Sequence, residues 1–137
     1  MSDFTEPLIL RFLDTEKDLR RFEIFSPFTY YIDRLGGDIK VEIPRGFRTD
    51  FASVPRLFWQ IIPPVGLYGK AAVVHDYLCS QRWIYKKNGL GWELYGVTRR
   101  EADQIFREAM KVLGVGKIKR NIMYLGVRLY SIFTFKK

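Results

Sequence analysis

Residues 38–43 read Asp-Ile-Lys-Val-Glu-Ile and are followed by Pro44. Polar and apolar side chains alternate here with a period of two, which is typical of a strand with one wet face and one covered face. Gly36-Gly37 indicates a hairpin turn just before this stretch. The same alternation occurs, less regularly, in two earlier runs at residues 21–25 and 28–32, and the apolar run at 8–13 is a further candidate strand. We therefore predict a small antiparallel sheet in the N-terminal half, with the run at 8–13 as an edge strand.

The C-terminal half has a helical period instead. Four helices are predicted, at about residues 53–62, 68–83, 98–113 and 118–134. The third has the clearest start, because Thr98 and Glu101 have the spacing of a capping box, and Gly114 is suited to its end. The residues between 83 and 98, which include Asn88-Gly89, are expected to form a loop. Three to four such helices would cover the sheet, so we predict one α+β domain over residues 1–137.

The charge of the chain is concentrated in its second half. The net charge is +8, and residues 51–137 contain 15 Lys and Arg against 5 Asp and Glu. A basic half of this kind is suited to nucleic acid, an anionic membrane surface or an acidic protein. The apolar stretch from Ile122 to Phe135 is interrupted by Arg128 and is shorter than the ~20 residues of a membrane span, so no transmembrane segment is expected.

Ionisable residues occur where the helical pattern predicts an apolar core. His75 is the only histidine and falls near the middle of the apolar arc of its helix, with Asp76 at the margin. Asp103 borders the buried arc of the next helix, and Asp50 stands at the junction of strand and helix. Burying such groups costs several kcal/mol unless each is paired or binds a metal. We predict that Asp50, His75 and Asp103 converge, with Asp76 or Arg56 at the edge.

Two interpretations of this cluster stay open. In the structural one, Asp50 caps a helix, His75 is a satisfied core residue, and Arg56 closes the network as a bidentate clamp. In the catalytic one, Asp50, His75, Asp76 and Asp103 bind a divalent metal that turns a bound water into a nucleophile. Arg56 would then hold an anionic group of the substrate.

Other side chains nearby are assigned structural roles. Cys79, the only cysteine, is interpreted as a small buried hydrophobic residue. Ser53 is expected to cap a helix and not to act as a nucleophile. Arg99 and Arg100 are expected to pair with neighbouring acids such as Asp103.

Three stretches together resemble a phage- and prophage-associated family of unknown function with the signature TDFASVP…HDYL…R..AD. They are TDFASVPR at 49–56, AAVVHDYL at 71–78 and RREADQIFREAM at 99–110. The likeness extends from about residue 37 to residue 128, and its signature positions include Asp50, His75, Asp76 and Asp103. The resemblance implies a phage context and no particular activity.

We accordingly expect a bacteriophage accessory or virion protein, of the neck, tail or baseplate type, in the virion or the host cytoplasm. It would act by binding other phage proteins or itself. The alternative is a metal-dependent hydrolase, because adjacent His75 and Asp76 with a later Asp103 are similar to the metal set of the HD phosphohydrolases. Asp50 would have to replace the first histidine of that set, and a divalent metal would be the cofactor.

Overall fold

The computed structural model describes residues 3–4, 7–12, 22–32, 37–49 and 69–135. These residues form an α+β fold with two small antiparallel sheets and three helices. The strands are β1 (Asp3–Phe4), β2 (Leu10–Phe12), β3 (Phe22–Ile24), β4 (Phe28–Tyr31), β5 (Ile39–Ile43), β6 (Arg48–Thr49), β7 (Trp83–Asn88) and β8 (Gly91–Gly96). The helices are α1 (Gly69–Gln81), α2 (Arg99–Val112) and α3 (Lys117–Phe135).

The predicted N-terminal strands are present, but they divide between two sheets where one was expected. The larger sheet has the order β1-β4-β5-β7-β8 and the smaller has the order β2-β3-β6. In the larger sheet β4 pairs with β5 in the register Tyr30 to Val41, as the predicted hairpin requires. In the smaller sheet β2 is an edge strand, as predicted, and its Leu10 faces Ile24 of β3. The period-two pattern identifies strands but does not show which of them pair.

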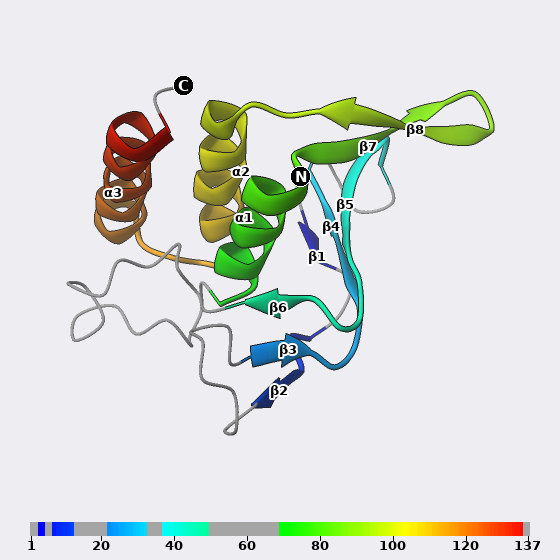
Figure 1. Ribbon diagram of the computed structural model, residues 1–137, viewed down its shortest axis with the longest axis horizontal. Helices are drawn as coiled ribbons and strands as arrows, with labels where there is room; N and C mark the ends of the chain where they lie inside the picture. Colours follow the sequence, from blue (N-terminus) through cyan, green and yellow to red (C-terminus); the bar gives the residue numbers. More distant parts are fainter. Residues whose placement is uncertain (1–2, 5–6, 13–21, 33–36, 50–68, 136–137) are drawn as a thin grey trace.

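The expected loop between residues 83 and 98 is wrong, because these residues form the β7–β8 hairpin. Lys86 faces Glu93 across the two strands, and Asn88 faces Gly91 next to the turn. Gly89 takes the first turn position with φ 64°, a backbone conformation that glycine adopts without strain. On the other side β7 pairs with β5, so the C-terminal half also supplies strands to the larger sheet. Figure 1 shows the hairpin projecting away from the helices.

Three of the four predicted helices are present. The second was expected to reach residue 83 but ends at Gln81, since Trp83 begins β7. The third begins at the predicted capping box, with both Thr98 and Glu101 hydrogen bonds formed, and Gly114 follows it with φ 86°. The fourth extends from Lys117 to Phe135. The helix expected at 53–62 lies outside the described residues.

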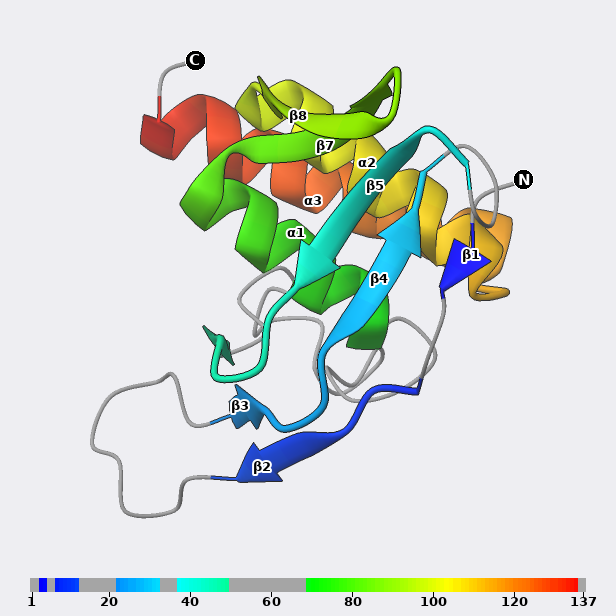
Figure 2. The same cartoon turned by 90° about the vertical axis from the view of Figure 1, so that its right-hand side faces the viewer.

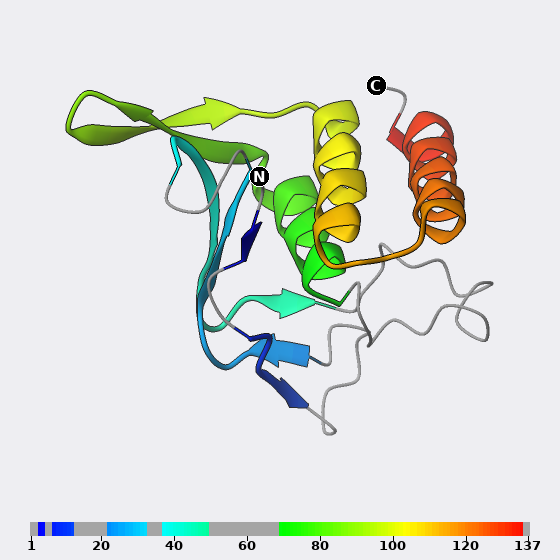
Figure 3. The same cartoon turned by 180° about the vertical axis from the view of Figure 1, so that it is seen from behind.

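The helices are stacked beside the larger sheet in the order α1, α2, α3. α1 contacts β5 and β6 on one side and α2 on the other, and α3 packs against α2. Figure 2 shows the larger sheet with the helices on one of its faces, and Figure 3 shows α3 as the outermost helix. The buried core includes Tyr30 and Val41 of the sheet, Val74 of α1 and Phe106 of α2. α1 is therefore the innermost helix, with apolar layers on two sides.

Candidate functional site

α1 positions His75 in the interior of the protein. Its residues from Ala71 to Val74 are all buried, and Leu78 continues the buried surface one turn after His75. The His75 side chain is 1% exposed, and its ring lies 4.8 Å from the ring centroid of Phe106 in α2. The prediction that His75 lies inside the core is confirmed. A buried imidazole needs a hydrogen-bond partner, and the facing helix is the nearest element that can supply one.

α2 supplies that partner. The capping box fixes the start of this helix at Thr98, and Asp103 then lies on the face that packs against α1. The His75 Nε2 and the Asp103 Oδ1 are 2.5 Å apart, so the imidazole and the carboxylate are in direct hydrogen-bond contact. Asp103 is fully buried, deeper than the border position predicted for it. The structure therefore brings together His75 and Asp103, from facing helices.

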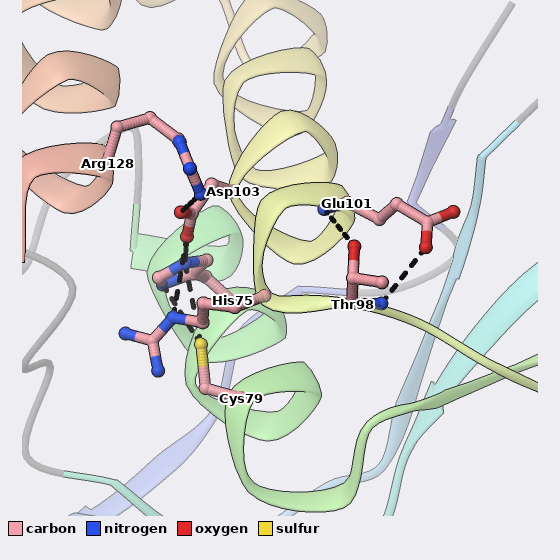
Figure 4. Close-up of polar contacts among 7 residues, drawn as sticks. His75, Cys79, Thr98, Glu101, Asp103 and Arg128 are labelled. Atoms are coloured by element: carbon pink, nitrogen blue, oxygen red, sulfur yellow. Dashed lines mark hydrogen bonds and ion pairs between the residues drawn. The ribbon is translucent and has the colours of Figure 1, made fainter. Parts of the chain in front are cut away.

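Two arginines contact the same carboxylate. Arg128 of α3 donates from Nη1 to the Asp103 Oδ2 at 2.8 Å, so the two Asp103 oxygens are bound from two different helices. Arg99, one turn before Asp103, places its Nε 3.7 Å from Oδ1, as the predicted pairing with a neighbouring acid requires. Figure 4 shows Asp103 between His75 and Arg128. Asp103 thus connects all three helices.

Burial lowers the pKa of His75 below its usual value, against the opposing effect of the Asp103 hydrogen bond. The direction agrees with the charges present, because Arg128 and Arg99 already balance the Asp103 carboxylate. A protonated imidazole would be a further cation around one buried anion. His75 is therefore neutral near neutral pH, and it donates its single N–H to Asp103.

Cys79, one turn after His75, belongs to the same cluster. Its Sγ lies 3.5 Å from the His75 Nε2 and 3.9 Å from Nδ1, and burial raises its pKa to about 12. The thiol is therefore protonated at neutral pH and is a poor nucleophile. In a nucleophile–base–acid relay the two partners bind opposite ring nitrogens. Here Cys79 and Asp103 both lie nearest to Nε2, which does not fit such a relay.

His75, Cys79 and Asp103 also form a possible donor set for a metal, with one ligand atom of each within 4.8 Å of the others. Ligand atoms about 2.0–2.1 Å from a tetrahedral zinc would be ~3.3 Å apart. The Nε2 and Oδ1 atoms are 2.5 Å apart, so the imidazole and carboxylate would have to separate. Arg128 at 2.8 Å from Asp103 would also repel a divalent cation. The described arrangement suits a hydrogen-bonded network better than a metal.

Asp76, the other predicted site residue that the structure describes, has a partner on the opposite side of α1. The Asp76 carboxylate is half-buried and accepts a hydrogen bond from the Thr49 hydroxyl at 2.5 Å, which ties α1 to β6. This contact gives Asp76 a structural partner on the sheet side of α1. Asp50 and Arg56, together with Ser53, lie outside the described residues.

Sequence reasoning missed two members of the cluster. Arg128 was noted only as an interruption of an apolar helix, although a lone cation inside an apolar stretch is itself a signal that an acid lies nearby. Cys79 was assigned to the core, and it does lie against the cluster, four residues after His75. The spacing of His75 and Cys79 on one helix face was visible in the sequence, and the facing Asp103 was predicted, but the contact of Arg128 with Asp103 was not.

Comparison with known proteins places most of this chain in one family. Residues 22–127 match the family described as "Protein of unknown function (DUF1353)". The chain belongs to the DUF1353 family. The matched region includes His75, Cys79 and Asp103, and it stops one residue before Arg128. The DUF1353 region therefore contains all of α1 and α2. It also contains the part of α3 that precedes Arg128.

A curated protein that is similar to this chain is much longer than it. The "Uncharacterized protein y4jT" of Sinorhizobium fredii is 35% identical over 112 residues, which are 80% of this chain. The matched segment covers 29% of that relative's length, so this chain spans less than a third of it. No solved structure gives a significant match.

Proposed function

We propose that this chain acts by binding another protein, as an accessory or virion component encoded by a phage or prophage. The phage part of the proposal rests on the likeness of residues 49–56, 71–78 and 99–110 to the phage-associated signature. The binding part rests on a surface of α3. The virion or the host cytoplasm would be its location.

The outward side of α3 carries the observation that supports binding. Met123 and Val127 are buried on the side that faces α2. On the other side, four large apolar residues are exposed to solvent, at 76% for Ile118, 42% for Ile122, 59% for Leu125 and 54% for Leu129. We call these four residues the α3 stripe. A contiguous exposed apolar surface marks an interaction site more often than scattered single residues do.

A membrane is a less suitable partner for the whole helix. Within the part of the chain that the structure describes, no helix has the length and apolar character needed to cross a bilayer. Helices that lie on a membrane surface typically combine Leu with Trp and Phe on the buried face. The α3 stripe consists of Ile and Leu alone, which is the composition of a helix–helix contact.

The test is a pull-down with the purified chain and its Leu125→Glu variant against the virion proteins of the phage that encodes it. We expect the wild type to retain a virion protein identified by mass spectrometry, and the variant to lose it, because a charge would enter the apolar contact. Leu94→Gln is the matched control, since Leu94 is equally exposed but lies on β8. Equal retention by wild type and Leu125→Glu would show that the α3 stripe is not the binding surface.

The alternative function, a metal-dependent hydrolase, has one observation in its favour, the donor set of His75, Cys79 and Asp103. A metal that binds only the folded state raises stability by ~2.7 kcal/mol at a hundredfold excess over its dissociation constant. Thermal unfolding with EDTA, Mg²⁺, Mn²⁺ or Zn²⁺ measures this directly. Our proposal predicts no metal-dependent rise in Tm. A rise that disappears in both His75→Ala and Asp103→Asn would favour the hydrolase.

A further inference from the structure

The spacing of the α3 stripe specifies the shape of its partner. The four residues follow one another at intervals of four, three and four, which is the a/d spacing of a heptad repeat. At 100° per residue they fall within one narrow band on the side of α3 opposite Met123 and Val127. A seam this narrow accommodates the apolar face of a single helix, whose side chains would fit between those of the stripe.

Both edges of the α3 stripe are free of acidic side chains. Lys119 follows Ile118 on one edge. Arg128 precedes Leu129 on the other, but its guanidinium is bound to the buried Asp103 and adds no free charge there. The chain has no acidic residue after Glu108. In paired helices the residues at these edges select the partner by charge. The edges of α3 are therefore complementary to an acidic helix.

The edge of the stripe that faces α2 borders a basic surface hollow. The hollow is lined by Gln104, Arg107, Glu108, Lys111, Arg120 and Tyr124. It is connected to the stripe through Asn121, which lies one helical turn from both Ile118 and Leu125 and accepts a hydrogen bond from the Arg107 Nε at 2.9 Å. A helix seated on the stripe would thus have one edge over this hollow.

Two of the three cations of the hollow, Arg107 and Arg120, are already held in place. The Arg107 guanidinium lies 5.6 Å from the Tyr124 ring centroid, and Arg120 donates from Nη1 to the Val115 carbonyl at 3.1 Å. Within the described ranges, no acidic side chain forms an ion pair with Arg107, Lys111 or Arg120. Side chains that are fixed in advance lose less conformational entropy when they bind an anion.

We propose that the α3 stripe and the basic hollow together bind an amphipathic helix of another protein that carries acidic residues along one edge. This inference rests on the proposed function and adds the chemistry of the partner. A second copy of this chain is a poorer occupant, because its α3 carries no acidic residue that could pair with Lys119 or with the cations of the hollow. An acidic edge would place carboxylates within reach of Arg107, Lys111 and Arg120, where each arginine can form charge-assisted hydrogen bonds.

The test uses two synthetic three-heptad peptides with Leu at a and d, one with Glu at e and g and the other with Gln at those positions. Each is fluorescently labelled and kept at nanomolar concentration, so that it stays monomeric, and binding is followed by anisotropy. We expect the Glu peptide to bind the wild type at least about fivefold more tightly than the Gln peptide, from a few solvent-exposed ion pairs. This preference should weaken as the salt concentration rises.

Three variants separate the two parts of the surface. The double variant Arg107→Gln/Lys111→Gln should clearly reduce the preference for the Glu peptide, since it removes two of the three cations of the hollow and leaves the stripe intact. Leu125→Glu should weaken binding of the Gln peptide at least about tenfold, because a buried apolar contact becomes charged. Leu94→Gln on β8 should bind like the wild type. Circular dichroism of each variant shows whether α3 is still folded.

Four results would overturn the inference. Equal binding of both peptides to the wild type would contradict the acidic edge of the partner. It would still be consistent with protein binding through the stripe. Binding of neither peptide, with the virion pull-down still sensitive to Leu125→Glu, would show that the partner is not a helix. Binding to phosphatidylglycerol vesicles that Leu125→Glu abolishes, without peptide binding, would identify a membrane surface. A dimer in light scattering that Leu125→Glu dissociates would identify a second copy.

Discussion

Asp103 is the side chain on which the described cluster depends. It is fully buried and is contacted by His75 of α1 and Arg128 of α3, with Arg99 close to Oδ1. We expect Asp103→Ala to lower the free energy of unfolding by ~3–5 kcal/mol, because arginine charges would be left in the interior without their carboxylate. Urea unfolding measures this change. Asp38→Ala, at an exposed acid just before β5, is the control and should stay within ~0.5 kcal/mol of the wild type.

His75 should make stability depend on pH. Burial holds its pKa below the ordinary value of 6.5, so in acid the unfolded chain takes up a proton that the folded protein does not. The free energy of unfolding should therefore fall as the pH decreases below 6.5, and it should level off once the folded protein is also protonated. Urea unfolding at a series of pH values measures the slope. In His75→Asn the free energy of unfolding should depend less steeply on pH below 6.5. An unchanged slope would show that other groups cause the pH dependence.

The sequence indicated which of these residues would be inside but not all of their contacts. The apolar arc of α1 was sufficient to place His75 in the core, and the arc of α2 placed Asp103 next to it. The contact between Asp103 and Arg128 depends on how α3 is rotated against α2, and a single sequence carries no information on that rotation. Asp50 and Arg56 stay predictions.

The β7–β8 hairpin is the element that sequence reasoning misjudged. Asn88-Gly89 was interpreted as part of a loop, although a turn dipeptide between two aromatic-rich runs is a hairpin signal. The runs themselves contain Trp83 and Tyr85 on one strand and Trp92 and Tyr95 on the other. Because helices are predicted on both sides, the residues between 83 and 98 are expected to be a loop that connects two helices. The capping box at Thr98, by contrast, depends only on local spacing and was located correctly.

The turn of this hairpin gives a prediction at the scale of one element. Gly89 has φ 64°, whereas Gly91 has an ordinary backbone, and an added Cβ would contact nothing at either position. We expect Gly89→Val to destabilise the hairpin by ~1–2 kcal/mol, through backbone strain alone. Hydrogen exchange of the amides in β7 and β8 measures it. Gly91→Val is the matched control, and equal effects of the two changes would argue against the strain.

At the scale of the whole molecule, the family match and the fold end at different places. The DUF1353 match stops at residue 127, whereas α3 continues to Phe135 and includes Arg128. A chain that ends at Val127 should lose ~3 kcal/mol or more in its free energy of unfolding, because Asp103 stays buried without the arginine. Urea unfolding compares it with the full chain. A chain that ends at Phe135 is the control, and equal stability of both truncations would contradict the expectation.

The α+β class was predictable because it follows from the local hydrophobic pattern. Apolar residues recur about every two residues in the first half and about every 3.6 residues in most of the second. The division into two sheets was not, since short strands of similar pattern give no preference for a neighbour. The contribution of β7 and β8 to the larger sheet joins the two halves of the chain. This long-range pairing is the part of the fold that local patterns specify least.

The end of the β7–β8 hairpin that adjoins the helices is held together by a backbone hydrogen bond. The amide of Val97 donates to the Arg82 carbonyl at 2.8 Å, which fixes the end of α1 next to the start of α2. The turn lies at the opposite end, where Leu90 is fully exposed and the hairpin points away from the helices (Figure 1). A fluorescent reporter or an affinity tag inserted between Gly89 and Leu90 would therefore leave both helices and the α3 stripe undisturbed. The hairpin turn is therefore a suitable site for labelling this protein.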